Sequence, residues 1–85
     1  MVAELDLHGL TLDQAEQRFG SFLRSRSVRD PGAVVRIITG RGAGAGTTPV
    51  IQGAVRDGLT DWASEWVVDW SVDSGGGAFL VRLRG

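Results

Sequence analysis

The sequence contains no cysteine, no lysine and no long apolar run, and these absences narrow its possible functions. Without cysteine the chain can form no disulfide, no thiol nucleophile and no thiolate metal site. The longest apolar runs span only a few residues, as at 66–68, and the N-terminus lacks a basic segment followed by an apolar stretch. The pattern therefore predicts neither a membrane span nor a signal peptide, and we expect a cytoplasmic protein.

Charge is unevenly distributed along the chain, although the net charge is only -1. From Arg18 to Arg56 there are seven arginines and one acid, Asp30, a local net charge of +6, whereas residues 57–73 contain five acids and no base. Such a segment is typical of a face that meets phosphate groups. The alternative is a set of solvated arginines, and because genome bias can also replace lysine by arginine, the count alone is weak evidence.

The chain has 85 residues, of which 42% are hydrophobic, so residues 1–85 fit one domain with a single core. Hydrophobic periodicity and turn residues predict the element order βαβαββ. Helices are expected after the N-cap residues Thr11 and Thr48. The expected strands are 4–8, 34–38, 66–72 and 79–84.

The third expected strand alternates in polarity, which predicts one buried and one exposed face. The buried face would carry Trp66, Val68, Trp70 and Val72, and the exposed face Val67, Asp69 and Ser71. Tryptophans at alternating positions of an apolar strand are more typical of a core than of base stacking. Trp62, which precedes the strand, is expected to be partly exposed.

The first two expected strands are joined through a helix, so they should run parallel and end at the same edge of the sheet. Ligands of open α/β sheets collect at that edge. Asp6 and His8 belong to the end of the first strand, and a glycine-rich loop, Thr39 to Gly46, follows the second. The topology therefore predicts that these segments meet.

The glycine-rich loop opens the second expected helix and combines exposed backbone N–H groups with the positive end of a helix dipole, which suits a phosphate. Arg41 adds a guanidinium that matches phosphate oxygens. The alternative is that the glycines only let the backbone bend. The loop has neither the Walker spacing nor that of a dinucleotide fingerprint. The candidate phosphate-binding residues are Thr39, Gly40, Arg41, Gly42, Gly44 and Gly46.

His8, the only histidine, is a candidate general base or acid near neutral pH. Asp6 could orient its ring, stabilise the imidazolium or ligate a metal. The alternative is that His8 only satisfies hydrogen bonds at the end of a strand and Asp6 caps the adjacent turn. No dedicated metal site is predicted, because the acids at 57, 61, 65 and 69 cross a helix, a loop and a strand and are typical of a solvated face.

The motif Leu5-Asp6-Leu7-His8-Gly9, followed by Thr39-Gly40-Arg41-Gly42 and by a closing strand after the glycines at 75–77, resembles the Smr (small MutS-related) family over nearly the whole chain. The resemblance implies an α+β two-layer sandwich like the C-terminal domain of bacterial translation initiation factor three. That fold has a mixed four-stranded sheet with two helices on one face. Histidine in the fourth position of the first motif makes this chain look closer to stand-alone Smr proteins than to the MutS2 branch.

The resemblance also implies an endonuclease that cleaves RNA or nicks DNA, with Asp6, His8 and Arg41 in catalysis. The implied partners are nucleic acid, the ribosome and further domains of a longer parent protein. RNA cleavage needs no metal, because His8 could take a proton from a 2′-hydroxyl, whereas DNA cleavage favours Mg²⁺ or Mn²⁺ at Asp6. The alternatives are a non-catalytic nucleic-acid or ribosome-binding module, and a protein-interaction domain that uses an exposed tryptophan.

Overall fold

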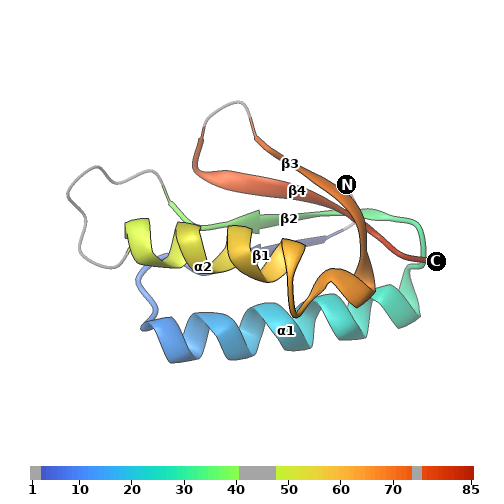
Figure 1. The fold of residues 1–85 in the computed structure, drawn as a ribbon, viewed down its shortest axis with the longest axis horizontal. Coiled ribbons are helices and arrows are strands. Elements are labelled where there is room, and N and C mark those ends of the chain that lie inside the picture. The colour runs from blue at the N-terminus through green and yellow to red at the C-terminus, as the bar shows by residue number, and fades with distance from the viewer. Residues whose placement is uncertain (1–2, 41–47, 74–75) are drawn as a thin grey trace.

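The computed structural model describes residues 3–40, 48–73 and 76–85, and side chains at 48 and 49 are left out of the description (Figure 1). Two helices and four strands alternate in the predicted order, with one short 3-10 helix added before the third strand. Their bounds are β1 Ala3–Asp6, α1 Leu12–Arg29, β2 Val34–Ile38, α2 Thr48–Thr60, η1 Ser64–Trp66, β3 Val67–Val72 and β4 Ala78–Leu83.

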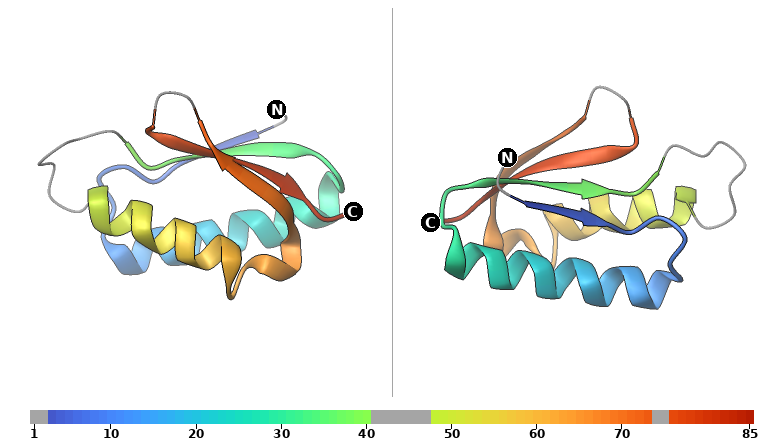
Figure 2. Two further views of the ribbon diagram at one scale, coloured as in Figure 1. Left: turned by 45° about the horizontal axis from the view of Figure 1, so that its top comes forward. Right: turned by 180° about the vertical axis from the view of Figure 1, so that it is seen from behind.

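The four strands form one mixed sheet in the order β1-β2-β4-β3, in which β1 and β2 are parallel and the other two pairings are antiparallel. Both helices pack against the same face of this sheet, and the opposite face is left uncovered (Figure 2). The predicted two-layer α+β fold with a mixed four-stranded sheet is therefore confirmed. Neither described helix is long and apolar enough to cross a membrane.

Helix α1 begins at the predicted capping box. The Thr11 hydroxyl accepts from the backbone N–H of Gln14 at 3.2 Å, and the Gln14 side chain accepts from the N–H of Thr11 at 3.1 Å. These two bonds satisfy donors that a helix start otherwise leaves unpaired. The helix then buries a stripe against the sheet, comprising Ala15, Phe19 and Leu23.

The two layers enclose one apolar core, in which each element contributes the side chains that face the other layer. Alternation in β2 and β4 directs every second residue inward, as the sequence predicts. The fully or almost fully buried side chains of these two strands are Val35, Ile37, Ala78, Phe79, Val81 and Leu83.

The face assignment of β3 is wrong at Val67, Val68 and Val72. Val68 is 53% exposed and Val72 50%, although both were expected inside, whereas Val67, expected outside, is buried. The register with β4 shifts between Val67 and Asp69, so one extra residue is inserted there and the alternation slips by one position. Trp66 lies in η1 and packs with Trp70 against the core, as expected for both rings.

Trp62 is 42% exposed, which agrees with the predicted partial exposure. Its ring packs where α1 and α2 come close to one another. Its ring meets Phe19 edge to face, with 5.4 Å between the centroids. Two glycines make room for it: a Cβ on Gly20 would lie 3.1 Å from the indole, and one on Gly58 would lie 3.1 Å from the indole and 2.8 Å from the Phe19 ring. The close approach of α1 and α2 therefore depends on these glycines.

Gly58→Ala should destabilise the protein by about 1–3 kcal/mol, because the added methyl overpacks Phe19 and Trp62. Gly53→Ala on the same helix is the matched control. A Cβ there meets nothing within 4 Å, so alanine should stabilise by about 0.5–1 kcal/mol through helix propensity. Urea denaturation measures both changes. Equal effects of the two substitutions would contradict this account of helix packing.

Candidate nucleic-acid interface

The predicted site lies at the edge where β1 and β2 end. Asp6 pairs with Ile38 across the parallel ladder, and the N–H of Leu7 donates to the carbonyl of Ile38 at 2.7 Å. The C-terminal ends of both strands and the N-terminal ends of both helices lie on one side of the molecule (Figure 2). The structure therefore brings Asp6 and His8 next to the start of the glycine-rich loop.

A tight turn holds His8 beside Asp6. The N–H of Leu10 donates to the carbonyl of Leu7 at 3.3 Å, and Gly9 occupies the third position of this turn with φ 79°. Only glycine adopts that backbone readily, which explains why it follows His8 in the sequence. The turn folds the chain back over the last residue of β1.

Two contacts join Asp6 to His8. One carboxylate oxygen, Oδ1 of Asp6, accepts from the backbone N–H of His8 at 3.0 Å and lies 2.5 Å from Nδ1 of its ring. The pair is open to solvent, with 68% of the His8 side chain and 49% of the Asp6 side chain exposed. One geometry therefore allows both roles that the sequence suggests for Asp6, which are to cap the turn and to orient the ring of His8.

The Asp6 carboxyl is held in its ionised form. The hydrogen bond from the His8 side chain is the main cause that lowers its pKa, and the bond from the His8 backbone N–H adds to it, against a small opposing effect of burial. With Nδ1–H directed at this carboxylate, Nε2 is the proton acceptor of the neutral ring. Nε2 has no protein partner within the described part of the chain.

Backbone hydrogen bonds hold the first two residues of the glycine-rich loop, Thr39 and Gly40, which we call the loop entry. The N–H groups of Thr39 and Gly40 donate to one carbonyl, that of Gly77 at the start of β4, at 2.9 and 3.0 Å. The Thr39 hydroxyl lies 3.4 Å from the same oxygen, and the residue is fully buried. Gly40 has φ 93°, a backbone that favours glycine. These two N–H groups are therefore engaged within the protein.

Gln52 was not predicted from the sequence to have a role at this edge. Its side-chain amide, one turn into α2, donates to the carbonyl of Gly40 at 2.8 Å and lies 3.5 Å from that of Gly76. Its amide contacts depend on the tertiary arrangement of the hairpin, which no local pattern encodes.

The other predicted loop residues, Arg41, Gly42, Gly44 and Gly46, lie outside the described residues. Their predicted roles in phosphate binding and, for Arg41, in catalysis stay predictions. So do the phosphate-binding roles of Thr39 and Gly40, for which the structure gives the geometry described above.

The arginines of the basic segment are spread over the fold. Arg26 pairs with Asp30 at 3.1 Å, and Arg36 bridges Glu4 at 3.2 Å and Asp73 at 2.8 Å on the uncovered sheet face. Ion pairing thus already engages two arginines of that segment. The described arginines of the segment that are exposed are Arg18, Arg24, Arg29 and Arg56.

The acidic series is solvated. Its four members, Asp57, Asp61, Glu65 and Asp69, are all exposed. Over residues 3–40, 48–73 and 76–85, no three histidine or acidic side chains come together in a way that could hold a metal ion.

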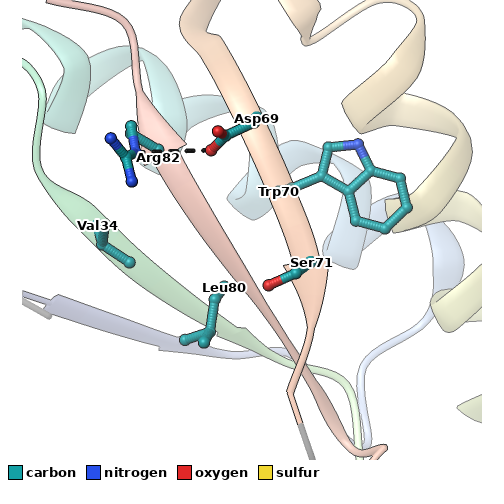
Figure 3. A pocket seen from close by; sticks show the side chains of 6 residues that line it. All are labelled: Val34, Asp69, Trp70, Ser71, Leu80 and Arg82. Carbon is teal, nitrogen blue, oxygen red and sulfur yellow. Dashed lines mark ion pairs between the residues drawn. The ribbon is translucent and has the colours of Figure 1, made fainter.

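A shallow depression of about 350 Å³ lies on the uncovered sheet face, away from the Asp6–His8 edge (Figure 3). Its side chains come from β2, β3 and β4, and Asp69 and Arg82 face one another at 3.6 Å across one end. The residues that line it are Val34, Asp69, Trp70, Ser71, Leu80 and Arg82. None of them was predicted to belong to the site.

His8→Ala should raise the pKa of Asp6 towards its ordinary value of 3.8, because the largest cause of its lowering is removed. A carboxyl with a lowered folded pKa stabilises the fold above its unfolded pKa and loses that contribution as pH falls through the folded value. The mutant should therefore lose the small stabilisation from Asp6 at a higher pH than the wild type. Carbon-detected NMR titration of the Asp6 carboxyl measures the shift, and an unchanged titration would contradict the pairing.

Comparison with known proteins agrees with this architecture. A family model described as the Smr domain matches residues 5–84. The crystal structure of the Smr domain of Thermus thermophilus MutS2 aligns with a TM-score of 0.79 and 25% sequence identity, covering 99% of this chain and 100% of that chain. No curated protein sequence gives a significant match. The chain belongs to the Smr domain family.

Proposed function

We propose that this Smr domain is an endonuclease that cleaves phosphodiester bonds in nucleic acid, with Asp6, His8 and Arg41 as its catalytic residues. Smr domains bind nucleic acids in general. The observation that carries the catalytic part is the Asp6–His8 pair, which lies at the strand edge beside Ile38, one residue before the glycine-rich loop begins. An oriented imidazole next to a phosphate-binding element is a suitable arrangement for proton transfer at a phosphodiester.

His8 is the proposed general base. The carboxylate of Asp6 contacts the ring through Nδ1, Nε2 has no partner among the described residues, and 68% of the side chain is open to an incoming substrate. If the substrate is RNA, Nε2 takes the proton of a 2′-hydroxyl and the 2′-oxygen attacks the adjacent phosphorus. The 5′-oxygen leaves and takes a proton from water, and the imidazolium returns its own proton to the solvent. Arg41 is assigned to the charge that builds on the phosphate oxygens. The products are a 2′,3′-cyclic phosphate end and a 5′-hydroxyl end.

The glycine-rich loop is the proposed phosphate-binding element. Because the N–H groups of Thr39 and Gly40 already donate to Gly77, we assign these two residues to holding the loop. Direct phosphate contacts then come from Arg41 and from the glycines that follow it. The charge and fork geometry of an arginine suit two phosphate oxygens at once.

A DNA substrate has no 2′-hydroxyl and would need an activated water. Asp6 is the carboxylate that could hold Mg²⁺ or Mn²⁺ for this purpose, since Mg²⁺ keeps several waters when one or two carboxylates bind it. The cation would supply an activated water. Cleavage of DNA with EDTA or with added Mg²⁺ or Mn²⁺ tests whether a cation is required.

The second candidate is a non-catalytic nucleic-acid or ribosome-binding module. It is favoured by the sparse chemistry of the edge, where the described side chains that can transfer protons are those of Asp6 and His8, both largely open to solvent. In this case the edge would hold a phosphate without cleaving its ester.

Three finer assignments accompany the proposal. We place residues 1–85 as one Smr domain, with room for further domains in a longer parent protein. We place the chain nearer to stand-alone Smr proteins than to MutS2, on the strength of His8. A cytoplasmic location is proposed because RNA and the ribosome are among the proposed substrates and partners.

Cleavage of labelled single-stranded RNA and supercoiled DNA, with EDTA or with added Mg²⁺ or Mn²⁺, tests the proposal. His8→Ala should slow cleavage by about 10²–10⁴-fold, the usual contribution of a general base. Arg41→Ala should weaken both binding and cleavage. Arg29→Ala, an exposed arginine at the far end of α1, is the matched control and should change neither strongly.

Unchanged cleavage by His8→Ala would refute its role as a base. Binding by the wild type and both site variants, with no cleavage under any condition, would favour the binding module instead. Cleavage of RNA that survives EDTA would support the metal-free attack of the 2′-hydroxyl. Cleavage of DNA that needs a cation would support the route through an activated water.

A further inference from the structure

We propose that Gln52 is a positioning residue that fixes the entry of the glycine-rich loop against the β3–β4 hairpin, and this inference rests on the proposed function. The observation is one side-chain amide between two segments far apart in sequence. Nε2 of Gln52 lies 2.8 Å from the carbonyl oxygen of Gly40 and 3.5 Å from that of Gly76. Gln52 itself comes from a third segment, α2.

A hydrogen-bond donor is needed where the loop entry meets the β3–β4 hairpin. The carbonyl of Gly77 already accepts from the N–H groups of Thr39 and Gly40, so the backbone donors of the loop entry are used up. The carbonyls of Gly40 and Gly76 lie nearby, and the Thr39 hydroxyl reaches that of Gly40 only at 3.5 Å. A glutamine amide carries two N–H donors on one nitrogen and can serve two carbonyls at once.

The backbone of the junction explains why a side chain is needed to hold it. Gly40 has φ 93° and Gly76 has φ 77°, conformations in which glycine is the least strained residue. Glycine restricts the chain least, so the direction of both carbonyls depends on what binds them. Gln52 binds one closely and lies at the limit of hydrogen-bond distance from the other.

The contacts form a continuous path from the catalytic pair to α2. Asp6 lies opposite Ile38 in the sheet, Gly40 follows two residues later, and Gln52 binds Gly40. A displacement of the loop entry would therefore change its position relative to Asp6 and His8. We infer that Gln52 acts on nucleic-acid binding through the loop, without touching the substrate.

The test compares Gln52→Met, which keeps a similar length and volume but has no donor, with Gln17→Met on the exposed face of α1. The side-chain amide of Gln17 has no hydrogen-bond partner among the described residues. Affinity for single-stranded RNA is measured by fluorescence anisotropy at several salt concentrations. Gln52→Met should bind about tenfold more weakly at low salt, the effect of losing one or two hydrogen bonds that hold the loop.

The salt dependence distinguishes positioning from simple stability. If the loop loses one phosphate contact, the slope of log K against log salt falls by about 0.7 for a single strand. Gln17→Met should keep the wild-type affinity and slope. Wild-type affinity in Gln52→Met, or a lower affinity with an unchanged slope, would overturn the positioning role.

Amide hydrogen exchange of Thr39 and Gly40 tests the same inference without any ligand. Their N–H groups should exchange about tenfold faster in Gln52→Met than in Gln17→Met, because the junction with Gly77 opens more often. Unchanged exchange would overturn the inference. If the wild type binds no nucleic acid, the proposed function fails, while faster exchange in Gln52→Met would still show that Gln52 positions the loop. Gln52→Glu, which also lacks the donor, should show the same faster exchange.

Discussion

β1 and β2 run parallel, with Asp6 opposite Ile38, and the whole candidate site depends on that pairing. Parallel strands joined through a helix end at the same edge, so residues more than thirty positions apart become neighbours. The turn at Gly9 then folds His8 back onto Asp6, and the chain beyond Ile38 enters the glycine-rich loop. Neither segment could form the site alone, because each supplies a different part of the chemistry.

The loop entry depends in turn on the hairpin of the other half of the sheet. The carbonyl of Gly77 accepts from the backbone N–H groups of Thr39 and Gly40, and the side-chain amide of Gln52 donates to the carbonyl of Gly40. Donors spent in this way cannot also bind a phosphate. In the proposed function, Thr39 and Gly40 therefore hold the loop entry, and the residues that follow Gly40 are assigned to the phosphate contacts.

Local signals predicted most of the fold. The capping box at Thr11 and the alternation in β2 and β4 depend on neighbours within a few residues, and they appear where the sequence places them. The inserted residue at Val68 could not be predicted, because a register shift is set by the partner strand and not by polarity. The contacts of Gln52 and the ion pairs of Arg36 were missed for the same reason, since each joins segments that only the tertiary fold brings together.

The central claim is that nucleic acid meets the strand edge of Asp6 and His8, and NMR titration with a short single-stranded RNA tests it most directly. The account predicts salt-sensitive shifts at the amides of His8, Gly40 and Gly76. It also predicts little change on the uncovered sheet face, where ion pairs engage Arg36 and a weak pair joins Asp69 and Arg82. Shifts centred on Val34 and Leu80, with none at His8, would contradict it.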